Sequence, residues 1–294
     1  MKNTLNKAKY EKKLVGLLSN LERKNTSNLL EASGVIFVND NYLVVFDEMH
    51  GIAKLPKSTD SFIGKGVIVG SQHNKEGFEA ITYDSRSKVI YALVENTPYK
   101  DGFFRPQIQQ FTMDLVKVGS PVTLPLNLPL DNVDSNKGLE GACIIHKADR
   151  TFLFGLCEGK GCNSDDSKEA KGRGVIQIFE HSNDKWNHLG HLKLPEEVDF
   201  RDYSDLAIRQ NHIAVTSQKS AKLWVGLIQP TTNSWSLTHQ NIYSFPQKNN
   251  KILYCNIEGV DWISDKQLVF VSDMASKKSC KAKEMMIHIF DIPH

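Results

Sequence analysis

The sequence lacks the features that would place it in a membrane or on a polyanion. Its apolar runs are only a few residues long, whereas a helix needs about 20 apolar residues to cross a bilayer. Lys and Arg number 36 against 34 Asp and Glu, and the resulting net charge of +2 creates no strong field of either sign. We therefore expect a small-molecule ligand as partner, with no nucleic acid and no membrane.

Cysteine is scarce, and its number is odd. The five cysteines are Cys143, Cys157, Cys162, Cys255 and Cys280. They cannot all pair within the chain, and no second close pair follows Cys157 and Cys162 to complete a zinc site. This predicts free thiols in a reducing compartment. The basic N-terminus continues into an apolar stretch, residues 14–18, that is too short for a signal peptide, so we expect a cytoplasmic location.

The common catalytic motifs are also missing. The 294 residues contain no G-x-S-x-G elbow, no Walker loop and no H-E-x-x-H zinc helix, so no motif supports serine nucleophilic catalysis. Helical periodicity is found only over Lys9–Arg23. The remaining pattern of short apolar runs separated by turn residues predicts an all-β protein.

What the sequence does contain is an internal repeat. Five segments begin with an acidic residue close to small residues, followed by a short apolar strand, a turn and a second strand. The five acids are Glu31, Glu79, Glu140, Asp205 and Glu258. They lie 48 to 65 residues apart, which is enough chain for a four-stranded antiparallel blade with its loops. The repeat predicts a five-bladed β-propeller.

The ring needs a further strand for closure, because the residues after Glu258 supply only three clear strands. We expect one domain over residues 1–294, in which the basic N-terminal segment, residues 1–24, completes the last blade. Two arrangements fit this segment. Lys13–Ser19 can add the fourth strand, or Lys9–Arg23 can form an amphipathic helix that caps the ring.

Three of the repeats resemble known propeller families. The stretches Gly77-Phe-Glu-Ala-Ile-Thr-Tyr83, Gly138-Leu-Glu-Gly-Ala142 and Ile257-Glu-Gly-Val-Asp-Trp262 resemble the Glu-Gly motifs of the esterase-like phytase and SdiA-regulated families. The count of five is also similar to that of the soluble calcium-activated nucleotidases, or apyrases. These resemblances imply a propeller with calcium in its central tunnel and a phosphoester or phosphoanhydride substrate. Asp205, with no glycine after it, departs from the motif.

The positions of the acids suggest a ring of carboxylates. The first strand of each blade lines the central channel of a propeller, so we predict that Glu31, Glu79, Glu140, Asp205 and Glu258 converge there. Converging carboxylates repel one another and are costly to bury, and Ca²⁺ relieves both effects with its preference for oxygen ligands. Alternatively, each acid accepts N–H bonds from the neighbouring blade and locks the blades together. A second polar set ends the second strands: Asp47, Glu48, Glu95, Glu158, Gln218 and Asp273.

Two functions follow from these residues. As an enzyme, the protein would be a metal-dependent hydrolase with Glu79, Glu140, Glu95 or Glu158 as the general base and the five acids of the ring as metal ligands. As a binding module, it would use the acidic ring only for stability and present its loops to a ligand or protein. The glycines after Glu140 and Glu258 are expected to allow close approach of the backbone.

Overall fold

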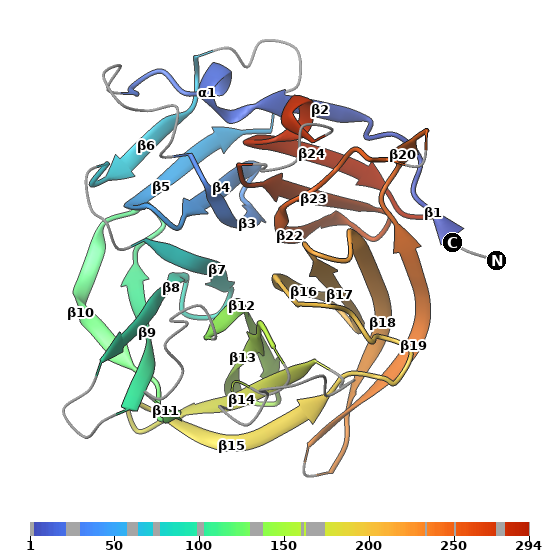
Figure 1. Cartoon of the computed structure of the whole chain (residues 1–294). Helices are drawn as coiled ribbons and strands as arrows, with labels where there is room; N and C mark the ends of the chain where they lie inside the picture. The colour runs from blue at the N-terminus through green and yellow to red at the C-terminus, as the bar shows by residue number, and fades with distance from the viewer. Residues whose placement is uncertain are drawn as a thin grey trace.

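The computed structural model describes residues 3–21, 30–57, 64–72, 77–98, 103–129, 138–159, 162, 174–232, 234–249, 251–274 and 280–293. Four-stranded antiparallel sheets are arranged around a central channel as five blades (Figure 1). The predicted all-β, five-bladed propeller is therefore confirmed. Neighbouring inner strands contact one another around the whole ring, including the contact between the last blade and the first.

Each blade is built from strands that follow one another along the chain, from the channel outwards. The first blade contains β3 (Ala32–Val38), β4 (Asn41–Phe46), β5 (Met49–Pro56) and β6 (Val67–Gly70). The second contains β7 (Phe78–Asp84), β8 (Val89–Pro98), β9 (Phe103–Phe111) and β10 (Lys117–Thr123), with β11 (Leu128–Pro129) paired to β9. The third contains β12 (Leu139–Lys147), β13 (Arg150–Cys157), β14 (Val175–Ser182) and β15 (Lys185–Lys193).

The last two blades recruit the N-terminal segment. The fourth blade contains β16 (Asp205–Arg209), β17 (His212–Ser217), β18 (Lys222–Pro230) and β19 (Trp235–Ser244), and β1 (Asn3–Thr4) pairs in parallel with β19. The fifth contains β22 (Ile257–Ser264), β23 (Gln267–Ser272), β24 (Met286–Asp291) and, as its outer strand, β2 (Tyr10–Lys13). A hairpin, β20 (Gln247–Lys248) and β21 (Lys251–Ile252), lies between these blades in sequence, and η3 (Lys281–Lys283) precedes β24.

The predicted closure by an N-terminal strand is confirmed, but the bounds given for it were wrong. The strand is β2, and the predicted range of 13–19 instead contains the single-turn helix α1 (Leu14–Leu17). The side chains explain the shift. Lys12 and Lys13 can point to solvent from an outer strand, whereas the apolar side chains of Leu14 and Leu17 are buried. After α1, the backbone of residues 17–19 pairs with Gly66 of the first blade. The N-terminal segment thus contacts the fourth, fifth and first blades in turn.

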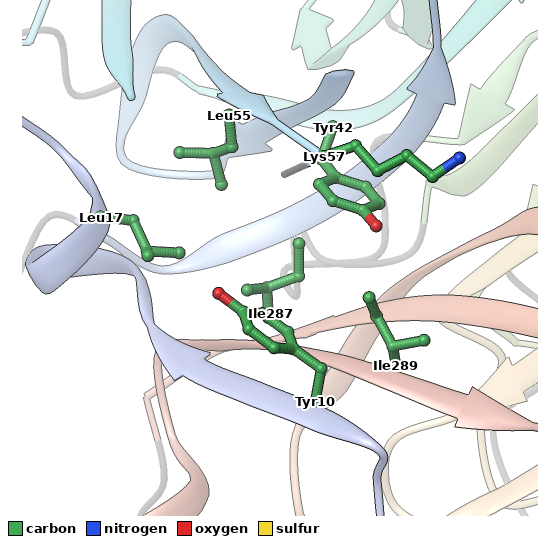
Figure 2. Close-up of a pocket in the computed structure, with 7 residues that line it drawn as sticks. All are labelled: Tyr10, Leu17, Tyr42, Leu55, Lys57, Ile287 and Ile289. Carbon is green, nitrogen blue, oxygen red and sulfur yellow. The ribbon is translucent and has the colours of Figure 1, made fainter. Parts of the chain in front are cut away.

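The seam between the fifth and first blades is apolar. Figure 2 shows the side chains that line a narrow gap here. They come from β2 and β24 of the fifth blade, from α1, from β4 and β5 of the first blade, and from the residue directly after β5. They are Tyr10, Leu17, Tyr42, Leu55, Lys57, Ile287 and Ile289. The gap has no room for a water molecule, so the seam is a dry packing contact.

A buried polar network also holds the closing strand. Glu11 on β2 forms an ion pair with Lys283 and accepts a hydrogen bond of 3.1 Å from the Tyr254 hydroxyl. One of its oxygens also lies 3.7 Å from Nδ1 of the fully buried His288 of β24, whose pKa is lowered by burial. These partners lower the pKa of Glu11 to about 2, with the His288 bond as the largest contribution. The closure is therefore specified by charge as well as by apolar contact.

Candidate functional site: an acidic channel mouth

Each inner strand begins with a β-bulge, and the bulged residue occupies the same position in every blade. In four blades the residue at the bulge has no partner on the second strand, while the residues on both sides of it are paired. In the fourth blade, the Ser204 N–H donates a hydrogen bond to the Thr216 carbonyl, and Asp205 is paired with the same residue in the sheet. The five equivalent residues are Ser33, Glu79, Glu140, Ser204 and Glu258. Bulges re-aim side chains, and here they do so at one end of the channel.

Three of these five positions carry glutamates, and other acids surround them. Glu140 interacts electrostatically with Glu79, Glu158 and Glu258, and Glu258 interacts with Asp47 and Asp273. Glu31 joins the group through Asp273. We name this group the acidic mouth: Glu31, Asp47, Glu79, Glu140, Glu158, Glu258 and Asp273. Asp47, Glu158 and Asp273 come directly after or at the ends of the second strands, as the sequence predicted for the second polar set.

The acidic mouth raises the pKa of its own carboxyl groups. Burial, followed by the charge of Asp273, raises the pKa of Asp47 to about 8 and that of Glu31 to about 7. Burial is again the main cause for Glu140 and Glu258, whose pKa values lie well above the usual range. Glu140 is also hydrogen-bonded to Glu79. A hydrogen bond between two carboxyl groups needs a proton on one of them, so this contact favours the protonated form of Glu140.

Two of the five predicted ring acids do not occupy the ring position. Glu31 precedes Ser33 by two residues and interacts electrostatically with Asp273 and Glu48. Asp205 follows Ser204 by one residue and is buried between blades. Its carboxylate accepts N–H bonds of 2.8 Å from Leu206 and from Val260 of the next blade, and a further backbone bond from Ala142 of the preceding blade. The prediction that Asp205 joins the other acids is wrong, because aligning the acids across the repeats ignores the bulge.

Asp205 is instead one of several clamps between neighbouring blades. Ser33 donates a hydrogen bond to the Phe78 carbonyl of the second blade, and Ser204 donates one of 3.0 Å to the Ile257 carbonyl of the fifth. The Gly141 backbone runs so close to Asp205 that an added Cβ would lie 2.9 Å from its Cα. The expected role of this glycine in close backbone approach is confirmed, and blade locking is the observed role of Asp205.

Two residues of the site were missed by the sequence analysis. Asp202 is buried at the position equivalent to Glu31 and accepts backbone N–H bonds from Lys219 at 2.9 and 3.0 Å. The Lys219 ammonium lies 3.0 Å from a carboxylate oxygen of Glu158 and so brings positive charge to the mouth. Burial is the largest single effect and opposes this charge. The hydrogen bond and charge of Glu158, with the charges of Asp202 and Glu258, together outweigh it and raise the pKa of Lys219. A repeated acid-x-Ser pattern, residues 31–33 and 202–204, could have revealed Asp202.

Two disulfides hold chain segments beside the mouth. Cys157 is bonded to Cys162 and directly precedes Glu158, while Cys255 is bonded to Cys280. The residue after Cys255, Asn256, accepts the Asp273 N–H through its carbonyl at 2.9 Å. The prediction of free thiols is wrong for these four cysteines, because the folded loops bring their Cα atoms within 5.3 and 5.6 Å, a proximity that sequence spacing does not reveal. The cytoplasmic location stays a prediction, and paired cysteines do not favour it.

The predicted Ca²⁺ site in the channel stays a prediction. Among the residues that the structure describes, no three acidic, histidine or cysteine side chains converge closely enough to hold a metal ion as they stand. Glu95, predicted as a candidate base, belongs to β8, but its side chain lies outside the described residues. Over the same described portion of the chain, no helix is long and apolar enough to cross a membrane.

The raised pKa values make the stability of the mouth dependent on pH. A carboxyl group whose pKa is higher in the folded protein stabilises it at low pH, and this stabilisation is lost as the pH rises through the folded-state value. For Asp47 the loss extends from its ordinary pKa near 4 up to about 8. We expect Asp47→Asn to raise the melting temperature at pH 8.5 by about 4 °C or more, and to change it little at pH 4.

The control for this measurement is Glu48→Gln, because Glu48 is the exposed neighbour of Asp47. It should alter the melting temperature far less at either pH. Equal changes in the melting temperatures of the two variants at pH 4 and 8.5, measured by calorimetry, would show that the pKa of Asp47 is not raised by burial.

Comparison with known proteins supports the fold. No protein-family model and no curated protein sequence matches the chain. The GH43_1 enzyme from Xanthomonas citri complexed with xylotriose matches with a TM-score of 0.53 at 8% identity, over 90% of this chain and 88% of that chain. At this identity the likeness shows a shared fold only.

Two further solved structures match over most of their length but with lower scores. The glutaminyl cyclase from Myxococcus xanthus has a TM-score of 0.49 at 11% identity, over 91% of this chain and 94% of its own. The PQQ-bound aldose sugar dehydrogenase from Streptomyces coelicolor has a TM-score of 0.48 at 11% identity, over 96% and 98%. By its own sheet topology and the acids at its channel, the protein is a five-bladed β-propeller with an acidic channel mouth. The phytase-like and nucleotidase resemblance stays a prediction.

Proposed function

We propose that the protein is a hydrolase whose reaction takes place at the acidic mouth. The observation that carries this proposal is the hydrogen-bonded pair Glu79 and Glu140, in which the pKa of Glu140 is raised well above its usual range. Such a pair holds one proton at neutral pH and therefore offers an acid and a base side by side. Hydrolysis needs both, since one group activates water and the other protonates the leaving group.

Each residue of the pair then has a role. Glu140, with its raised pKa, is the proton donor, and ionised Glu79 is the base that accepts a proton from water. Glu258 and Glu158 keep the pair protonated through their negative charge, because both interact with Glu140. Raised pKa values concentrate at catalytic sites, which supports this assignment.

The substrate class remains the predicted one, a phosphoester or phosphoanhydride small molecule. Carboxylates repel phosphate, so the substrate needs a positive partner at the mouth. Lys219 fills this role in the proposal, because its ammonium lies 3.0 Å from Glu158 and can move to a phosphate oxygen. Calcium, predicted from the ring of acids, would supply further positive charge. Since the described side chains do not converge on an ion as they stand, no step is assigned to it.

The proposal is tested by hydrolysis assays on p-nitrophenyl phosphate, bis(p-nitrophenyl) phosphate and pyrophosphate, each with Ca²⁺ or with EDTA. We expect Glu140→Gln to lower kcat by about 100-fold or more, because it removes the proton donor but keeps the side-chain shape. The matched control is Glu48→Gln, which changes an exposed acid close to Asp47 and Glu31 and should leave kcat within about twofold.

The outcomes separate the parts of the proposal. Hydrolysis that is equal in wild type and Glu140→Gln contradicts the role of the pair. Hydrolysis that is lost in Glu140→Gln but insensitive to EDTA supports the pair and contradicts the calcium prediction. Turnover of none of the substrates contradicts the phosphoester assignment.

A binding module without catalysis is the second candidate, and Asp205 favours it. This acid was predicted as a metal ligand, yet both its carboxylate oxygens accept backbone N–H bonds, one from Leu206 of its own strand and one from Val260 of the next blade. If the other acids serve stability in the same way, Glu140→Gln lowers the melting temperature, and a ligand that protects the wild type is bound but not turned over.

A further inference from the structure

The central channel contains a second feature, a cavity beyond the acidic mouth. Its volume is about 360 Å³, and it is lined by the later residues of all five inner strands. Val260 and Ala142 in this lining follow the ring position by two residues, so the cavity begins about 7 Å along the channel from it. Pockets for small molecules have volumes of about 300 to 1,000 Å³, so the cavity is large enough for a ligand of its own.

The cavity combines one carboxylate with aromatic rings. Asp261 lies beside Phe37, Tyr83 and Trp262 in the lining. One oxygen of Asp261 accepts the Phe37 N–H at 2.6 Å, which fixes the carboxylate in place across the seam of the ring. The Trp262 indole donates to the Ala207 carbonyl at 3.3 Å, so this ring is also held in a defined position.

The nearest basic side chain does not neutralise Asp261. Arg209 also lines the cavity, but its guanidinium donates a bond of 2.8 Å to the exposed Asp265. Burial raises the pKa of Asp261 to about 7. The backbone N–H bonds from Phe37 and Trp262, followed by the charge of Arg209, oppose this effect only in part. The negative charge of Asp261 also acts on Cys143, another residue of the lining. Burial and then the charge of Asp261 raise the pKa of its thiol to about 12. A cation in the cavity would offset this negative charge.

We propose that the channel cavity binds a small organic ammonium ion, whose charge pairs with Asp261 and whose apolar part lies against the apolar residues of the lining. A carboxylate in a partly dehydrated cavity is a directional partner for such a cation. A divalent metal ion is a poorer occupant, because it takes about six or more oxygen ligands and Asp261 is the one carboxylate in the lining. The site is separate from the Glu79 and Glu140 pair and does not depend on the proposed hydrolysis.

The test compares charged probes with a neutral molecule of the same size. Butylammonium and choline are titrated into the wild-type protein by calorimetry and by ligand-observed NMR, with 1-butanol as the neutral counterpart of butylammonium. We expect saturable binding of the ammonium probes and at least about tenfold weaker binding of 1-butanol, as expected for loss of one charged partner.

Variants then locate the site. Asp261→Asn keeps an oxygen for the Phe37 N–H, so the fold should persist, and it should weaken ammonium binding by at least about tenfold. Asp114→Asn removes an exposed carboxylate outside the cavity lining and should change the affinity by less than about twofold. Absence of saturable binding of both ammonium probes overturns the proposal. So does equal binding of butylammonium and 1-butanol, or unchanged affinity in Asp261→Asn.

Discussion

Deletion of residues 1–13 is expected to lower the melting temperature by about 10 °C or more, because it opens the ring. The deletion removes β2, which forms the outer edge of the fifth blade, together with β1 on the fourth. It also removes Leu5, which is 2% exposed, and Glu11 with its buried partners. The outer edge of β24 would then carry unpaired N–H and carbonyl groups, which favours aggregation.

The expected loss can be separated from a general effect of shortening the chain. Lys12→Ala changes an exposed residue of the same strand and should leave the melting temperature nearly unchanged. Leu14→Ala, at a residue with no exposed surface, should cost about 2 to 5 kcal/mol, whereas Val15→Ala at its exposed neighbour should cost far less. A truncated protein as stable as the wild type in calorimetry would show that the ring does not depend on β2.

Asp205→Ala should be the most destabilising substitution among the five predicted ring acids. It leaves the buried N–H groups of Val260 and Ala142 without their acceptor, and each unsatisfied buried group costs about 1 to 3 kcal/mol. Since these bonds join the third, fourth and fifth blades, the loss should appear in the free energy of global unfolding. Chemical denaturation of Asp205→Ala and wild type measures it.

Two comparisons test the role of Asp205 as a clamp. Asp265→Ala, at an exposed aspartate with an Arg209 partner, should cost less than about 1 kcal/mol. Asp205→Asn keeps one oxygen acceptor and should lie between Asp205→Ala and wild type. If Ca²⁺ raises the melting temperature of the wild type, the same rise in Asp205→Asn fits a clamp. Loss of that rise would return Asp205 to the predicted metal ligands.

The acidic mouth could be predicted in outline but not in its membership. Glu79, Glu140 and Glu258 were found because they precede small residues in similar repeats, and the structure brings them together. In the other two blades the bulge position is a serine, Ser33 or Ser204. The sequence did not reveal this, because each serine has an acid within two residues that was aligned with the glutamates instead. Asp202 and Lys219 lie outside the repeated strands, so the repeat does not reveal them.

The sequence by itself determined the class of fold. Short apolar strands, turn residues and five phased repeats are local patterns, and local patterns decide which segments pair as neighbours in a blade. The need for an N-terminal strand followed from the same count, since the last repeat was one strand short. The burial of Leu14 and Leu17 in α1 also reflects a local apolar spacing.

Only the tertiary structure decided which acids act together. A β-bulge changes by one residue which side chains of a strand point to which side. Asp205 therefore accepts an N–H bond from the next blade, while Glu258, in a similar motif, lies among the acids of the channel mouth. The pairing of Cys255 with Cys280 and the joining of Glu11 to His288 likewise depend on distances across the ring. Burial and mutual repulsion, which raise the pKa values at the mouth, arise only when residues far apart in the sequence converge.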